Sequence, residues 1–123
     1  MGWSNDYLSA AIHLCLQPTD MRKNFDGLVG LVTTGLHKDP VRDGAFVFVN
    51  KRRDKMKILL WDRHGFWLLY KRLEAGCFQM PPHDSGATSL DPESLRLTYE
   101  QLVMIIEGID LRSVKRRKRY ALS

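Results

Sequence analysis

The chain has 123 residues, of which 44% are hydrophobic and 27% charged, and its formal net charge is +5 at pH 7. This size and apolar content predict one domain with its own core, which excludes a chain that needs metals or disulfides to fold. The positive charge favours a polyanionic partner, such as nucleic acid. No apolar run approaches the length of a membrane span and no secretory signal is visible, so we expect a cytoplasmic protein with no membrane partner.

The first third of the chain predicts a strand followed by a helix. Residues 11–16 form a short apolar run that ends at Gln17-Pro18, which is typical of a strand at a sheet edge. Thr19 or Asp20 is then expected to cap a helix that ends before Pro40. The apolar positions of this helix recur at spacings of three and four, which predicts one buried face: Met21, Phe25, Leu28, Val29, Val32 and Leu36.

The middle of the chain predicts an antiparallel meander. Runs rich in aromatic and branched residues at 45–49, 58–61 and 66–73 are the expected strands, and Gly65 closes a short hairpin loop at 62–65. We expect a further short strand at 77–80, a polar loop at 83–92 and another strand at 94–97.

A second helix is predicted near the end of the chain. Thr98 and Gln101 have the spacing of a capping box, and Gly108 stands where a left-handed cap is needed. The predicted buried stripe of this helix is Leu102, Ile105, Ile106 and Ile109. Together the elements predict an α+β fold in which a curved antiparallel β-meander sheet packs against two α-helices. This single domain would span residues 1–111, followed by a basic, flexible C-terminal tail at 112–123.

The positive charge concentrates in two clusters. If Trp61 pairs with Phe66 across the hairpin, Lys57 lies opposite Tyr70, and the cations of two strands meet at one end of the sheet. This first cluster contains Lys51, Arg52, Arg53, Lys55, Lys57, Lys71 and Arg72. The second cluster, in the tail, contains Arg112, Lys115, Arg116, Arg117, Lys118 and Arg119. Both are predicted nucleic-acid-binding sites because phosphate backbones attract clustered cations, whereas the alternatives are a solvated sheet end and a solubility tail.

No catalytic or metal-binding constellation is recognisable in the sequence. His64 has no second histidine nearby, the carboxylates are scattered singly, and neither a nucleophile motif nor a glycine-rich phosphate loop occurs. His13, Cys15, Cys77 and His83 lack the close pairing typical of zinc ligands. We therefore predict no catalytic residue, no metal and no cofactor. An aromatic stripe could stack bases, but a packed sheet face is the favoured interpretation: Phe46, Phe48, Trp61, Phe66, Trp67 and Tyr70.

Several blocks of the sequence, in order along nearly the whole chain, resemble one known family. The blocks at residues 19–28, 46–48, 51–59, 61–66, 70–78, 97–98 and 102–110 are similar to those of the TnpB accessory proteins of insertion sequence 66-type bacterial elements. Asn24 departs from the family pattern, in which glycine is expected. The residues that carry the resemblance include Asp20, Met21, Arg22, Lys23, Phe25, Asp26, Gly27, Trp61, Asp62, Gly65, Glu107 and Gly108.

The resemblance implies a non-catalytic protein that assists transposition beside a separate, larger transposase carrying the catalytic carboxylates. The expected partners are DNA, bound at transposon ends or without sequence preference, and the element-encoded transposase. The alternatives are a protein–protein adaptor that does not touch DNA and a small nuclease.

Overall fold

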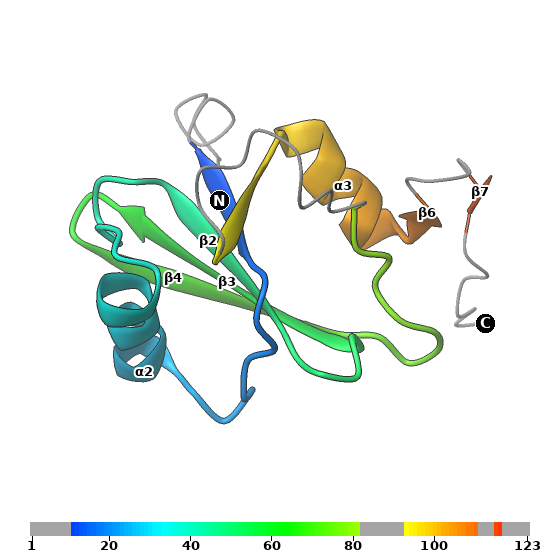
Figure 1. Ribbon diagram of the computed structural model, residues 1–123, viewed down its shortest axis with the longest axis horizontal. Coiled ribbons are helices and arrows are strands. Elements are labelled where there is room, and N and C mark those ends of the chain that lie inside the picture. The colour runs from blue at the N-terminus through cyan, green and yellow to red at the C-terminus, as the bar shows by residue number, and fades with distance from the viewer. Residues whose placement is uncertain (1–10, 82–92, 111–114, 117–123) are drawn as a thin grey trace.

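The computed structural model describes residues 11–81, 93–110 and 115–116. Five strands form one open sheet in the order β4-β3-β2-β1-β5 (Figure 1). The strands are β1 (Ile12–Cys15), β2 (Ala45–Val49), β3 (Lys55–Asp62), β4 (Gly65–Arg72) and β5 (Ser94–Leu97). With the helices described below, this arrangement confirms the predicted single α+β domain.

The sheet is mixed and not wholly antiparallel. Strand β1 was predicted at an edge but lies between β2 and β5. It pairs parallel with β2 and antiparallel with β5, whereas β2, β3 and β4 form the expected antiparallel meander. The segment 16–44 between β1 and β2 contains a helix and is long enough for the crossover that a parallel pair requires. The prediction of a wholly antiparallel sheet missed this crossover.

The first helix begins later than predicted. Helix α2 spans Phe25–Gly30 and continues as the π-helix η1 (Leu31–Gly35). Asp20 does not cap it, because its Oδ1 accepts the backbone N–H of Arg22 at 2.9 Å in a turn ahead of the helix. Phe25, predicted to be buried, is 44% exposed, since it is the first helical residue and precedes the turn that reaches the sheet.

Two apolar clusters cover the two faces of the sheet, because successive side chains of a strand point to opposite faces. On one face α2 and η1 pack against β2 and β3 through Leu28, Val32, Leu36, Phe46, Phe48 and Leu59. On the other face Leu102 and Ile105 of helix α3 (Tyr99–Glu107) join residues of β1, β2, β3 and β5. Figure 1 shows α2 and α3 on opposite sides of the sheet.

Helix α3 has the caps that the sequence predicts. Thr98 Oγ1 accepts the N–H of Gln101 at 3.1 Å, and Gln101 Oε1 accepts the N–H of Thr98 at 2.9 Å. Gly108 ends the helix with a φ of 81°, which only glycine adopts without steric cost. The predicted burial of Leu28, Val32 and Ile105 is confirmed, whereas the side chain of Ile109 lies outside the described residues.

The predicted strand at 77–80 is not formed. Phe78 is nevertheless buried, because its N–H donates to the carbonyl of Arg53 at 2.6 Å and its ring enters the apolar cluster on the α3 face. After α3, strands β6 (Ile109–Asp110) and β7 (Lys115–Arg116) pair antiparallel.

Other predicted features fall outside the described residues. They are the loop at 83–92 and the tail cations Arg112, Arg117, Lys118 and Arg119. No helix in the described ranges is long and apolar enough to cross a membrane.

Leu28→Ala is expected to lower the free energy of unfolding by about 2–5 kcal/mol, because the side chain is fully buried and its loss leaves a cavity. Phe25→Ala, in the same helix, is the matched control and should cost about 1 kcal/mol or less, given its exposure. Urea denaturation of both variants measures the difference. An equal loss of unfolding free energy in the two variants would mean that Phe25 is as buried as Leu28, which would contradict the later start of α2.

Candidate nucleic-acid interface

A tight turn between β2 and β3 carries the centre of the first basic cluster. Asn50 Oδ1 accepts the backbone N–H groups of Asp54 and Lys55, both at 3.0 Å, and Asn50 Nδ2 donates to Asp54 Oδ1 at 2.7 Å. The N–H of Arg53 donates to the carbonyl of Asn50 at 3.0 Å. The turn therefore presents three successive exposed cations on a fixed backbone: Lys51, Arg52 and Arg53.

This turn is also tied to the chain that follows β4. The carbonyl of Asp54 accepts the N–H of Leu73 at 2.8 Å, and the carbonyl of Arg53 accepts that of Phe78. Hydrogen bonding to the Asn50 side chain lowers the pKa of the Asp54 carboxyl, which therefore stays ionised beside the cations. Sequence analysis overlooked Asn50, although an asparagine that opens a charged hairpin turn is a usable signal.

The predicted hairpin register is confirmed. Trp61 pairs with Phe66, Lys57 with Tyr70, Met56 with Lys71, and Lys55 with Arg72. Lys71 and Arg72 therefore lie at the same end of the sheet as the turn. They lie on two faces, however, because Arg72 shares the face of Lys55 whereas Lys71 shares the face of Met56.

Arg72 also has an acidic partner. Its Nη2 lies 2.7 Å from Glu74 Oε1, in an ion pair that remains largely exposed. The cations of β4 thus flank the turn without forming one continuous patch with it.

Lys57 is not an exposed cation, and its prediction as a phosphate ligand is wrong. Only 2% of the residue is exposed, because its side chain lies on the α2 face of the sheet, where the segment 21–24 that precedes α2 covers it. Its Nζ donates to the carbonyls of Met21 at 2.8 Å and Lys23 at 2.7 Å, and to Asn24 Oδ1 at 3.1 Å. These acceptors engage the three N–H donors of the ammonium group. The same nitrogen lies 4.7 Å from the ring centroid of Tyr70.

No local pattern predicts these contacts, because Lys57 and its acceptors are more than thirty positions apart. Asn24, the residue that departs from the family pattern, supplies one of them. The block at 19–28 thus forms a turn held to the sheet, followed by the start of α2.

Asp20 and Arg22 form an ion pair beside this turn. Arg22 Nη2 and Nε donate to Asp20 Oδ2 at 2.7 Å and 3.0 Å, and the Arg22 side chain keeps an exposed fraction of 91%. Hydrogen bonds from the Arg22 side chain and backbone lower the pKa of Asp20 to about 2. The carboxylate therefore holds the Arg22 guanidinium in one orientation while leaving it open to a ligand.

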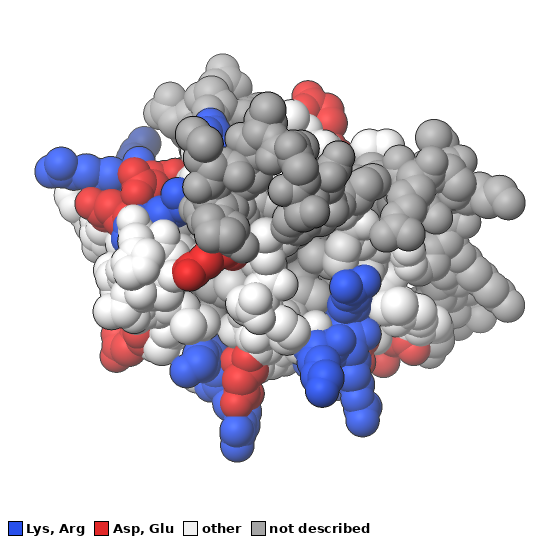
Figure 2. All heavy atoms as spheres, in the orientation of Figure 1, with Lys and Arg blue, Asp and Glu red and all other residues white. Residues whose placement is uncertain are grey.

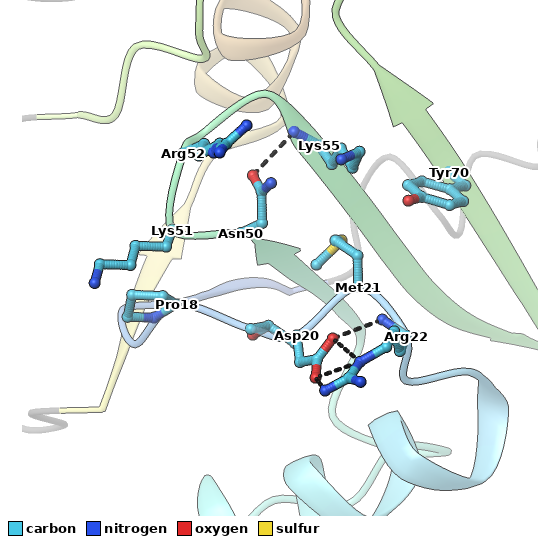
Figure 3. A pocket seen from close by; sticks show the side chains of 10 residues that line it. Pro18, Asp20, Met21, Arg22, Asn50, Lys51, Arg52, Lys55 and Tyr70 are labelled. Atoms are coloured by element: carbon cyan, nitrogen blue, oxygen red, sulfur yellow. Dashed lines mark hydrogen bonds and ion pairs between the residues drawn. The ribbon is translucent and has the colours of Figure 1, made fainter.

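A groove of about 560 Å³ separates the segment 18–22 from the turn at 50–55 (Figure 3). Its wall includes the ring of Tyr70, the Asp20 carboxylate and four cations: Arg22, Lys51, Arg52 and Lys55. Figure 2 shows Lys and Arg side chains projecting in separate groups along the lower edge of the molecule, with Asp and Glu side chains beside them. A further group of Lys and Arg side chains lies at the upper left of the same view, so the positive charge around the groove and turn is neither continuous nor confined to them.

The remaining sequence candidates lie elsewhere. Trp61, Asp62 and Gly65 form the hairpin at the other end of β3, where Asp62 Oδ2 accepts the indole N–H of Trp67 at 3.1 Å. Glu107 and Gly108 end α3. Of the tail cations, Lys115 and Arg116 form β7, and their side chains are not described.

The histidines and cysteines of the described ranges do not form a metal site, since no three His, Cys, Asp or Glu side chains there are close enough to hold an ion. His13 is buried, with its Nε2 2.8 Å from the carbonyl of Asp43 and its ring stacked on Phe46. Burial lowers the pKa of this imidazole and raises the pKa of the Cys15 thiol. Both groups are therefore uncharged at neutral pH.

Fold and site together define a small α+β domain with a cationic turn and groove at one end of an open sheet. The family model described as "IS66 Orf2 like protein" matches residues 10–116. The chain belongs to this family of insertion-sequence accessory proteins, as its sequence blocks predicted.

Two curated relatives come from Sinorhizobium fredii (strain NBRC 101917 / NGR234). "Uncharacterized protein y4jC" is 38% identical over 106 residues, which cover 86% of this chain and 85% of the relative. "Uncharacterized protein y4hO" is 33% identical over 94 residues, or 76% of each chain. No solved structure matches the chain.

Lys57→Met is expected to lower the free energy of unfolding by about 2–5 kcal/mol, because buried acceptors lose their donor while the side-chain volume is kept. Lys55→Met, on the same strand and face but partly exposed, is the control and should change stability by about 0.5 kcal/mol or less. Chemical denaturation measures both. If Lys57→Met left the free energy of unfolding unchanged, the ammonium group would not be what holds the segment 21–24.

Proposed function

We propose that this protein is a non-catalytic accessory factor of transposition that binds the DNA backbone through the turn at 50–55. The observation that carries the proposal is the run Lys51-Arg52-Arg53, three exposed cations on a turn whose backbone is fixed by Asn50. A turn whose backbone is already fixed loses little backbone freedom when its cations meet phosphates. Family membership supplies the biological setting, an insertion-sequence system of bacteria.

Binding of this kind carries little sequence information. Phosphate contacts position a protein on DNA, whereas base edges in the grooves specify the sequence. The exposed cations of the first basic cluster lie on a turn and at strand ends, not on a helix, and the neighbouring helix α2 has only six residues. We therefore assign the choice of DNA sequence to the transposase, which is the second proposed partner, and the site of action to the bacterial cytoplasm.

Two variants with matched backbones test the role of the turn. Arg53 and Arg63 are exposed arginines in hairpin turns at opposite ends of β3, with φ values of 60° and 59°. Asparagine tolerates this left-handed region, so either Arg→Asn change removes one charge without adding strain. Arg53→Asn should weaken binding to duplexes of any sequence, and loss of one phosphate contact should reduce the slope of log K against log salt by about 0.9.

Arg63→Asn should leave that slope unchanged. Fluorescence anisotropy on element-end and scrambled duplexes, at several salt concentrations, measures both variants. Equal effects would mean that net charge alone sets binding. No effect at Arg53, together with capture of the transposase by the protein, would favour the adaptor that does not touch DNA.

Deletion of residues 112–123 tests the tail. We expect weaker binding to element-end and scrambled duplexes alike and a flatter salt plot, because six clustered cations neutralise phosphates without fixing a geometry against base edges. Truncation after Arg116 keeps the β6–β7 pair, removes Arg117, Lys118 and Arg119, and should give part of the effect. A loss confined to element-end DNA would show that the tail reads sequence or shape.

A further inference from the structure

Tyr70 is an aromatic side chain of the sheet that the core leaves uncovered. Phe46 and Phe48 are fully buried, as the core interpretation of the aromatic stripe predicts, but Tyr70 is 55% exposed. It lies on β4 beside the groove, and Figure 3 shows it across from the segment that carries Asp20 and Arg22. A large ring that is exposed in a charged groove suits a ligand with a flat, apolar part that can stack on it.

The Tyr70 ring is held in a defined place. It pairs directly with Lys57 across the two strands, and the Lys57 ammonium lies 4.7 Å from the ring centroid. That ammonium is itself fixed by three acceptors from the segment 21–24. The ring is therefore positioned before any ligand arrives, which lowers the entropic cost of stacking.

The groove adds charge to this aromatic surface. Four cations line it with Tyr70, against the single carboxylate of Asp20, which is already paired with Arg22. An aromatic side chain next to a cationic groove is the arrangement that binds single-stranded nucleic acid, where bases stack on the ring and cations follow the backbone. In a duplex the bases are stacked on one another, so a ring in a groove reaches only an unpaired base.

We propose that the groove is a binding site for single-stranded DNA, in which Tyr70 stacks on an unpaired base while Arg22, Lys51 and Lys55 contact the flanking phosphates. This site rests on the proposed function, because the turn at 50–55 forms one wall of the groove, and it extends that function to unpaired segments of DNA. An acidic protein segment would meet the same cations but would gain little from the ring.

The test compares Tyr70→Leu with Tyr70→Phe and Tyr70→Trp, using a labelled oligothymidine and a duplex of the same length. Leucine keeps an apolar side chain without a stacking surface, so affinity for the single strand should fall by at least about fivefold. Phenylalanine should keep the affinity, and tryptophan should keep or raise it. Trp67→Leu is the control, since Trp67 is 44% exposed on the opposite face of β4, and it should bind like the parent protein.

The outcomes separate the site from the proposed function. A parent protein that binds duplex but not oligothymidine overturns the single-strand site alone, and one that binds neither overturns both. Equal single-strand affinity of the Leu, Phe and Trp variants also overturns the site. So does polyglutamate that competes as well as oligothymidine, because the groove would then be a general anion surface. A loss confined to Tyr70→Leu and to the single strand supports it.

Discussion

The buried ammonium group of Lys57 is the interaction on which the rest of the site depends. A charge removed from water is tolerated only when its hydrogen bonds are satisfied, and here the acceptors are the carbonyls of Met21 and Lys23 and the side chain of Asn24. The segment 21–24 must therefore lie against β3. This constraint places the start of α2, the Asp20–Arg22 pair and the ring of Tyr70 around a single groove.

Two of the sequence blocks that mark the family, together with Tyr70 of a third, meet at this groove. The block around residues 19–28 supplies one wall, and the central block supplies the turn at 50–55 and strand β3 with Lys57. The segments are distant along the chain, yet the hydrogen bond from the N–H of Thr19 to the carbonyl of Val49 and the contacts of Lys57 make them neighbours. Blocks that are separate in the sequence thus form one groove, whereas the blocks at 61–66, 97–98 and 102–110 lie elsewhere in the fold.

The two basic clusters have different physical characters. The cations at 51–53 lie on a turn fixed by five hydrogen bonds that involve Asn50, so the backbone that carries them is in place before a partner binds. The tail cations crowd into eight positions, where like charges repel one another until an anion neutralises them. Rigid and crowded cations together would suit a factor that holds DNA of any sequence beside a transposase with its own specificity.

Features that depend on residues close together in the chain were predictable from the sequence. The hairpin register followed from a loop at 62–65, and both caps of α3 followed from Thr98, Gln101 and Gly108, because these bonds close within a few positions. The end of the sheet that carries Lys71 and Arg72 followed from the same register.

Features that depend on residues far apart in the chain became visible in the folded structure alone. The inner position of β1, the exposure of Phe25 and the burial of Lys57 each depend on which segment packs against which. Sequence patterns identified Lys57 as one cation of a basic run. Its burial became possible only when acceptors more than thirty positions away were brought to its ammonium group, because local pattern carries no information on such a pairing.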